Sequence, residues 1–257
     1  MDSPVSAVEI ARRGLCRMIA TGELATGQLL PSEAELCERF EVSRSSLREA
    51  QKMLAVAGVL TARPGSRTAV SDMSAQQMMS GLEMIIPLLP LDRFLELFPL
   101  REVLEGHAAA LSAAKVSDGQ CRRLAELADE LAATEPSDRA QLLDADFHSM
   151  IIDGAGDEVI AALLATIRRR GRDYHVYEDA GHADLKVISD QAHHKIAQAI
   201  AGRDPESARF LAMQHVRTTR EWLEGIRPGP VIFEAGTPPL PAAVTPAPAA
   251  GTGRLRR

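Results

Sequence analysis

Apolar residues recur at helical spacing along most of the chain, and polar or glycine-rich stretches separate the segments. Near the N-terminus this spacing predicts a helix over residues 5–21, ended by Gly22, and two further helices that begin after Ser32 and Ser43. Ser32 is followed three residues later by Glu35, which is the capping-box pattern. Two short β-like pieces come next, with a Pro-Gly turn signal between them. Three helices followed by a hairpin are the plan of a winged helix-turn-helix domain.

The rest of the chain is predicted to be almost entirely helical. Helical spacing covers residues 92–115, 117–133, 137–154, 156–172, 184–202 and 204–224. The expected fold is therefore mainly α, with the N-terminal winged helix-turn-helix joined to an all-α helical-bundle effector domain. We assign residues 1–72 to the first domain, 73–90 to a linker with one short helix, and 91–227 to the bundle. The tail, 228–257, holds seven of the fifteen prolines and is predicted to be disordered.

Composition agrees with a helical fold and excludes several classes of protein. The 257 residues are 46% apolar and only 4% aromatic, which favours helices over strands. The three cysteines are far apart and form no disulfide framework or thiolate metal motif, so a reducing cytoplasm is the expected setting. We expect no signal peptide. The longest apolar run, residues 84–91, is too short and too rich in proline to span a bilayer.

The charges are unevenly distributed, and this changes what the net charge of −6 implies. Residues 1–72 carry nine Lys or Arg and nine Asp or Glu, so the negative excess lies in the remainder of the chain. Within residues 41–70, five basic residues stand against two acidic ones. That local excess is enough for a patch that contacts phosphates.

The start of the third predicted helix is dense in groups that bind DNA. Hydroxyls, a guanidinium and free backbone N–H groups meet there, at a helix N-terminus. Arg44 and Arg48 are four residues apart, so both project from one face, and either can pair with a guanine edge in the major groove. The alternative is that both arginines are solvated surface charges. The residues that we expect at the DNA interface are Ser32, Ser43, Arg44, Ser45, Ser46, Arg48, Arg63, Gly65 and Arg67.

This region resembles the DNA-binding domain of the GntR family of bacterial transcription regulators, over about residues 8–71. The residues that carry the resemblance are Leu30-Pro31-Ser32-Glu33-Ala34-Glu35-Leu36, Val42-Ser43-Arg44-Ser45-Ser46-Leu47-Arg48-Glu49-Ala50 and Gly58-Val59-Leu60-Thr61-Ala62-Arg63-Pro64-Gly65-Ser66. The family usually has a second wing glycine where this chain has Arg67. The resemblance implies a dimer that binds a palindromic operator and changes its geometry when an effector binds.

Four residues of the second half have the spacing and environment of metal ligands. Asp144 and His148 are one helical turn apart on the same face. His193 and His215 share faces with apolar residues of their predicted helices, so they point into the bundle, where an unpaired imidazole is costly. Three imidazoles and one carboxylate suit a divalent metal, zinc first, with nickel or manganese as alternatives. The competing interpretation is a set of separate, hydrogen-bonded core histidines.

The same half resembles the C-terminal effector domain, called FCD, of FadR-type GntR regulators, over about residues 92–222. The resemblance rests on Phe98-Pro99-Leu100-Arg101-Glu102-Val103-Leu104-Glu105, Asp144-Ala145-Asp146-Phe147-His148, His193-His194-Lys195-Ile196-Ala197-Gln198-Ala199-Ile200 and Met213-Gln214-His215. It implies a divalent metal held by Asp144, His148, His193 and His215, and a small organic carboxylate as effector. Arg101 is then expected to grip the effector, with a structural pair to Glu105 as an equal alternative. The run of arginines over 168–172 is expected to be a solvated helix end.

Together these patterns predict a transcription regulator and not an enzyme. Its expected partners are a double-stranded DNA operator, a small carboxylate effector and a second copy of the chain, with no membrane. Two alternatives stay open: a constitutive DNA-binding repressor whose metal site is purely structural, and a metal-dependent hydrolase that carries a DNA-binding domain. The second lacks support, because we find no general base beside the ligands, no Gly-rich phosphate loop and no nucleophile elbow.

Overall fold

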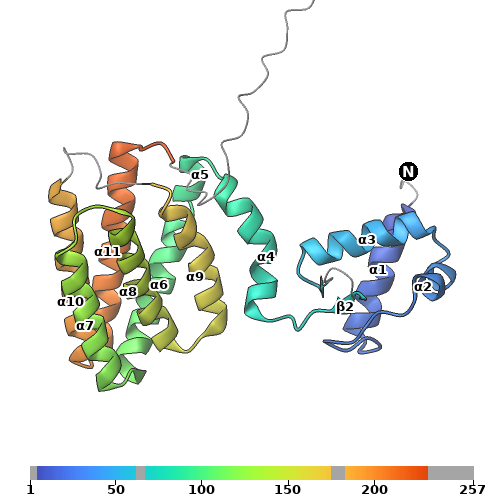
Figure 1. Cartoon of the computed structure of the whole chain (residues 1–257), viewed down its shortest axis with the longest axis horizontal. Coiled ribbons are helices and arrows are strands. Elements are labelled where there is room, and N and C mark those ends of the chain that lie inside the picture. Colours follow the sequence, from blue (N-terminus) through green and yellow to red (C-terminus); the bar gives the residue numbers. More distant parts are fainter. Residues whose placement is uncertain (1–4, 62–66, 175–182, 231–257) are drawn as a thin grey trace, which may run out of the picture.

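The computed structural model describes residues 5–61, 67–174 and 183–230, and it shows two helical bodies connected by one helix (Figure 1). The predicted mainly α fold is confirmed. The N-terminal body contains α1 (Ala7–Ala20), α2 (Glu33–Phe40), α3 (Arg44–Val56), β1 (Leu60–Thr61) and β2 (Ala69–Val70). The connecting elements are α4 (Ala75–Ile85) and the short 3₁₀ helix η1 (Ile86–Leu88). The C-terminal body contains α5 (Leu91–Leu95), α6 (Phe98–Lys115), α7 (Asp118–Ala132), α8 (Asp138–Ala155), α9 (Glu158–Gly171), α10 (Ala183–Ala201) and α11 (Pro205–Ile226).

Local capping sets the helix starts of the N-terminal body. The Ser32 hydroxyl accepts from the backbone N–H of Glu35 at 3.3 Å, and the Glu35 carboxylate accepts from the backbone N–H of Ser32 at 2.8 Å, so the predicted capping box forms. The Ser43 hydroxyl accepts from the backbone N–H of Ser46 at 3.2 Å. The two strands pair antiparallel, and buried leucines of the three helices pack beneath them. Arg63 and Gly65, both predicted at the DNA interface, lie outside the described residues.

The C-terminal body is a bundle in which α6 packs against α11 and α8, while α10 lies against α7 and α11. Its interior is built from small and aliphatic side chains, with Phe147 fully buried among them. Side-chain caps begin most of its helices, such as Ser117 on α7 and Asp157 on α9. No helix in the described part of the chain is both long and apolar enough to cross a membrane.

One predicted helix, over residues 92–115, is two helices in the structure, α5 and α6. Pro99 lies in the first turn of α6, where its missing N–H would have no partner anyway. The same ring would collide with the carbonyl of Leu95 if the helix ran through without a break. Phe94 packs edge-on against Phe98, with ring centroids 5.4 Å apart, which holds the two helices at this break.

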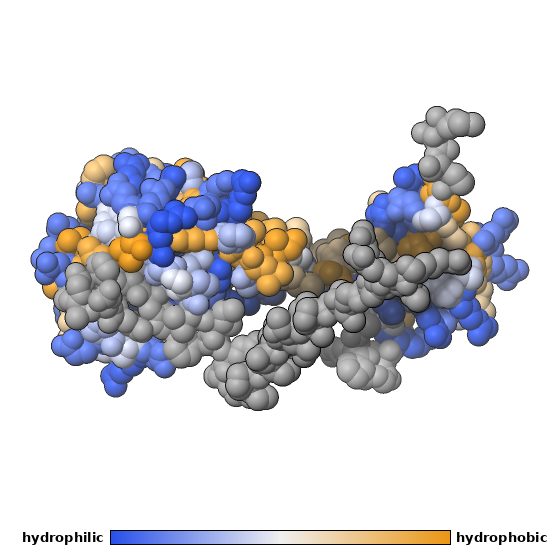
Figure 2. Space-filling model, turned by 90° about the horizontal axis from the view of Figure 1, so that it is seen from above, coloured by the Kyte–Doolittle hydropathy of each residue, from blue (hydrophilic) through white to orange (hydrophobic). Residues whose placement is uncertain are grey.

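Helix α4 contacts both bodies. The turn after α3 contains Gly58, whose φ of +74° suits glycine, and a Cβ added there would lie 2.0 Å from the Gln77 carbonyl oxygen. The Ser80 hydroxyl donates to the Val56 carbonyl at 3.3 Å. At its other end α4 packs against α9. Apolar side chains also gather on the surface of α4 and η1 (Figure 2), and those most exposed are Met78, Met84, Ile85 and Leu88.

Candidate metal centre and nucleic-acid interface

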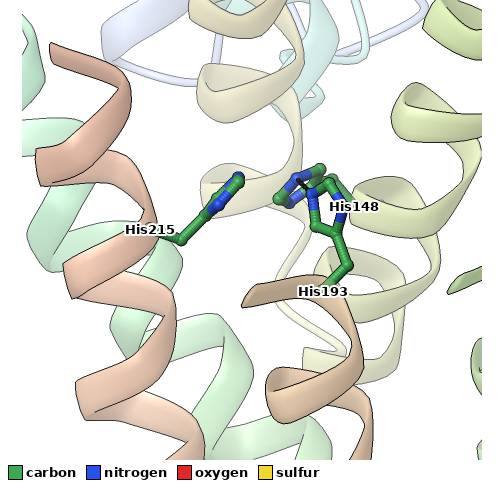
Figure 3. Close-up of side chains that lie close together, drawn as sticks. All are labelled: His148, His193 and His215. Carbon is green, nitrogen blue, oxygen red and sulfur yellow. Dashed lines mark hydrogen bonds between the residues drawn. The ribbon is translucent and has the colours of Figure 1, made fainter. Parts of the chain in front are cut away.

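Three buried histidines from three helices meet inside the C-terminal bundle (Figure 3). His148 comes from α8, His193 from α10 and His215 from α11, and they are only 3%, 1% and 6% exposed. A nitrogen from each ring lies within 4.8 Å of the other two. His148 Nε2 and His193 Nε2 lie 3.2 Å apart. Residues separated by 67 positions in the sequence therefore face one point, as expected of a ligand set.

Asp144, the fourth residue predicted for this site, also faces the histidines. It stands one turn before His148 on α8, and its Oδ1 lies 3.4 Å from His193 Nε2 and 3.6 Å from His148 Nε2. Its other oxygen accepts a hydrogen bond from Arg168 at 2.9 Å. One carboxylate oxygen is thus directed at the histidines while the other is held by an arginine.

Glu105 also lies at this site, although the sequence reasoning did not assign it there. Its Oε2 lies 3.3 Å from His148 Nδ1, and Arg168 donates to both of its oxygens at 3.1 and 3.2 Å. Arg101 donates to Glu105 through Nε at 2.5 Å. If the Nδ1 proton of His148 points at Glu105, the lone pair on Nε2 points at His193 and Asp144. The one signal in the sequence that could have indicated Glu105 was its position four residues after Arg101 on the same helix.

The spacing of His148 Nε2, His193 Nε2 and Asp144 Oδ1 suits a metal ion with tetrahedral ligands, and a ring nitrogen of His215 lies within 4.8 Å of the two other rings. Two nitrogens bound to one zinc ion lie about 3.3 Å apart, given zinc–nitrogen distances of about 2.0–2.1 Å. His148 Nε2 lies 3.2 Å from His193 Nε2. Asp144 Oδ1 lies 3.6 Å from His148 Nε2 and 3.4 Å from His193 Nε2. Nδ1 of His193 is buried and has no hydrogen-bond partner among the described residues, so Nε2 is the ring atom that its surroundings engage. The buried triad can therefore bind a metal ion.

Burial and neighbouring charges put these groups in the protonation states that metal binding needs. Burial lowers the pKa of His193 well below its usual value, with repulsion from His215 adding to the effect. Burial likewise lowers the pKa of His215 to about 3. For Glu105 burial acts in the opposite direction, but Arg101 and Arg168 outweigh it and hold its pKa well below the usual range. Neutral imidazoles and ionised carboxylates are the metal-binding forms.

A cavity of about 120 Å³ adjoins the triad and reaches toward the ends of α8, α9 and α10. Arg101, Asp144, Arg168, His193 and His215 line its inner part. Arg101 is only 5% exposed, and it lines the cavity while it is bonded to Glu105. The two alternatives for Arg101, a contact to the effector and a pair with Glu105, therefore do not exclude each other.

The prediction that residues 168–172 form a solvated helix end is wrong for two of its arginines. The Arg168 side chain is 10% exposed because α9 packs where α6 and α8 present Glu105 and Asp144. Arg170 is 5% exposed, and it donates to the Leu89 carbonyl and to Asp173, both at 2.9 Å. The side chain of Arg169, which lies between them in the sequence, is 54% exposed, as expected for a solvated helix end.

The start of α3 presents a cluster of hydroxyls beside an exposed arginine. Ser43 Oγ lies 2.8 Å from Ser45 Oγ and 2.9 Å from Ser46 Oγ, around the first turn of the helix. Arg44 is the first residue of α3 and is exposed. Ser32 is exposed at the corresponding start of α2, where its hydroxyl serves the capping box. These side chains lie where a helix N-terminus can approach phosphates and base edges.

Two other arginines predicted at the DNA interface are engaged within the protein. Arg48 makes a two-point ion pair with Glu33 of α2, at 2.8 and 3.0 Å, although its side chain is 63% exposed. Arg67 donates to the Leu30 carbonyl at 3.3 Å, just before α2. Arg48 would have to leave Glu33 in order to reach a guanine.

Comparisons with known proteins agree with this architecture. Residues 8–70 match the bacterial regulatory proteins, gntR family, and residues 96–218 match the FCD domain. The chain is 31% identical over 215 residues to the HTH-type transcriptional repressor NanR of Cronobacter sakazakii, covering 82% of each chain. It is 28% identical over 227 residues to the Glc operon transcriptional activator of Escherichia coli K12, covering 85% of this chain and 89% of the activator.

A solved structure supports the same assignment. The Streptococcus agalactiae GntR structure superposes with a TM-score of 0.54 and 30% identity, over 83% of this chain and 99% of that chain. The proteins to which the chain is similar are regulators of transcription and not enzymes, as the sequence predicted. The chain therefore belongs to the GntR family of bacterial regulatory proteins, as a DNA-binding transcription regulator with an FCD effector domain.

Proposed function

We propose that this regulator binds a palindromic operator as a homodimer and is controlled by a small organic carboxylate that binds beside a metal ion in the helical domain. The observation that carries the proposal is a buried histidine triad, joined by Asp144, that opens directly onto a cavity lined by arginines. An isolated structural metal site would need no such cavity. The relatives named above are regulators of opposite sign, an activator and a repressor.

Asp144, His148, His193 and His215 would hold the metal, for which we propose zinc. Glu105 supports this set by fixing the ring of His148, and Arg168 supports it by fixing the carboxylate of Asp144. When bound, the ion would supply positive charge and a coordination position for an oxygen of the effector. The remaining contribution comes from the side chains of the cavity.

Arg101 is the residue that we propose to bind the carboxylate of the effector. It uses Nε for Glu105, and no hydrogen bond from its two terminal nitrogens is seen among the described residues. A guanidinium has five N–H donors, so its outer edge stays available for a carboxylate. Because Arg101 is buried, such a hydrogen bond would form in a poorly screened environment.

Helix α9 offers a route from the cavity to the DNA-binding domain. Arg168 faces the cavity, and two residues later Arg170 donates to the Leu89 carbonyl at 2.9 Å, next to η1. Arg169 lies 3.8 Å from Glu83 of α4. A shift of α9 on effector binding would therefore move α4, which contacts the end of α3. The effector must favour one of the two arrangements for this coupling to work.

Dimerisation and operator binding follow from two surfaces in this proposal. Exposed apolar side chains on α6 and α11, such as Val103 and Phe210, support association through the helical domain. Two-fold symmetry would then place two α3 helices about one turn of DNA apart. Arg44 and the serine cluster beside it would enter the major groove, with Arg67 and the wing on the backbone.

Metal content per protomer of the gently purified full-length protein tests the central claim. We expect about one ion per chain, lost in His148→Ala and in His193→Ala. His107→Ala, which changes a partly buried histidine outside the triad, is the matched control and should keep the ion. Wild-type protein that holds no metal even after reloading would refute the metal site. A metal-loaded protein whose operator affinity no carboxylate changes would instead support the constitutive alternative.

A further inference from the structure

A second cavity, of about 110 Å³, lies in a groove between α10 and α11, and we call it the outer groove. Its polar and aromatic lining includes Ser189, Gln191, Lys195, Gln214, Thr218 and Trp222. Of the described residues, only Ser189 and His215 border both the outer groove and the cavity beside the histidine triad. Elsewhere the two sites use different faces of α10: Asp190 faces the triad's cavity, whereas Lys195 faces the outer groove. The outer groove is therefore a separate site.

The polar side chains of the outer groove have unused hydrogen-bonding capacity. Ser189 is only 2% exposed and lines the groove, and its hydroxyl has no hydrogen-bond partner among the described residues. Within the same part of the chain, the side chains of Gln191, Lys195, Gln214 and Thr218 also make no hydrogen bond. A buried hydroxyl without a partner is costly, and a ligand that bonds to it would remove that cost.

The outer groove separates charge from apolar surface along its length. Helices α10 and α11 are joined by a short connection and pack against each other, so they run antiparallel (Figure 1). Ile188 lies seven residues, or about 10 Å, before Lys195 on α10, and the antiparallel arrangement places Trp222 at the same end as Ile188. Gln191 and Thr218 lie between the two ends. The groove thus offers an apolar end with an aromatic ring, a hydrogen-bonding middle and a cationic end.

We propose that the outer groove is a second ligand site of the helical domain, which binds an elongated monoanion with an aromatic ring at one end, an amide in the middle and a carboxylate at the other end. The carboxylate would pair with Lys195, and the ring would pack on Trp222. An amide both donates and accepts, so it can serve Gln191 and Thr218 at once. No acidic side chain of the described residues lines the groove to oppose the anion.

A fluorescence titration of the full-length, zinc-loaded protein tests this site, because Trp222 is the single tryptophan of the chain and lines the groove. The probe is N-benzoylglycine, which has the ring, the amide and the carboxylate. Benzoate, which lacks the amide, and N-benzoylglycinamide, which lacks the charge, are the comparison compounds. We expect a saturable change in fluorescence with N-benzoylglycine, and affinities at least about tenfold lower for both comparison compounds.

Two variants of the groove and one matched control assign the binding to these side chains. Lys195→Gln should weaken the binding of N-benzoylglycine about tenfold, because it removes the charge that pairs with the carboxylate. Thr218→Val, which replaces a hydroxyl by a methyl group of similar size, should weaken it about fivefold. Lys52→Gln removes a 76% exposed lysine of α3 and should leave the affinity unchanged.

The metal-free variant His148→Ala separates the outer groove from the triad's cavity. It should bind N-benzoylglycine as tightly as the wild type does, because His148 does not line the groove. Loss of binding in His148→Ala would place the compound beside the metal and overturn the inference. An absent saturable response of the wild type, or unchanged affinity in both Lys195→Gln and Thr218→Val, would overturn it as well. Failure of the proposed function appears separately, as wild-type protein that holds no metal.

Discussion

Replacement of Arg168 by methionine should strongly destabilise the metal-free helical domain. Arg168 donates hydrogen bonds to both Glu105 and Asp144, at 2.9–3.2 Å, and its side chain is 10% exposed. Together with Arg101 it balances the charge of the two carboxylates. Methionine has a similar length but no charge, so one of the two negative charges loses its compensation.

The loss of stability in Arg168→Met depends on which partners Glu105 and Asp144 keep. Removal of one member of a buried ion pair costs about 3–5 kcal/mol. Glu105 keeps Arg101, and Asp144 is 31% exposed and partly screened by water, so we expect the lower end, about 3 kcal/mol. A bound divalent cation would take over the lost compensation, so the loss should be clearly smaller in zinc-loaded protein. Arg169→Met, which changes a 54% exposed arginine, should cost less than about 0.5 kcal/mol.

Urea unfolding followed by tryptophan fluorescence measures this difference in the right domain. Trp222 is the single tryptophan of the chain and lies on α11 of the bundle, so its signal reports the helical body and not the winged domain. A loss below about 1 kcal/mol in chelated Arg168→Met, or a loss equal to that of Arg169→Met, would refute the assignment of Arg168 as a buried structural cation. An equal loss with and without zinc would refute its link to the metal site.

Three other predictions concern pH, the DNA-reading helix and the junction between the two bodies. In metal-free protein the unfolded chain protonates its histidines near pH 6.5, whereas burial lowers the folded pKa of His215 to about 3. The unfolded state binds more protons between these values, so stability should fall below pH 6.5, by about 1.4 kcal/mol per unit for this residue alone; a flat stability profile from pH 7.5 to 5 contradicts this. Arg44→Ala should weaken operator binding, and the wild-type dimer should show a slope of log K against log salt of roughly −7 if each subunit neutralises about four phosphates; a slope near zero excludes this mode. Gly58→Ala should lower the stability of the N-terminal body by about 1–3 kcal/mol, because its Cβ would meet the Gln77 carbonyl at 2.0 Å. Gly81→Ala, where nothing lies within 4 Å, should not destabilise, and equal melting curves for both variants would refute the contact.

Features that depend on a few neighbouring residues could be predicted from the sequence. The capping box of Ser32 and Glu35 and the cap at Ser43 each need groups only three residues apart, so their spacing determines the helix starts. The same holds for Asp144 and His148, one turn apart on α8. The break between α5 and α6 was also local, and Pro99 signals it through its ring and its missing N–H.

Features that depend on packing between distant segments could not be predicted in this way. The burial of Arg168 is decided by Glu105, 63 positions earlier, and by Asp144 on a third helix. A run of arginines at a helix end has the same pattern whether it meets water or carboxylates. Arg48 is similar, because its spacing from Arg44 gives the helix face but not the position of Glu33, whose carboxylate holds the guanidinium.

The same packing makes α9 the element through which the cavity and the DNA-binding domain can influence each other. Consecutive arginines at its end serve different neighbours: Arg168 faces the cavity, Arg169 faces Glu83 of α4, and Arg170 holds the Leu89 carbonyl beside η1. A helix cannot move one of these contacts without the others, because its backbone is rigid over a single turn. The N-terminal part of α4 packs tightly as well, because the contact between Gly58 and Gln77 leaves no room for even a methyl group. In the proposed mechanism, a ligand that shifts Arg168 would therefore also displace the contacts of Arg169 and Arg170, which lead through α4 to the end of α3.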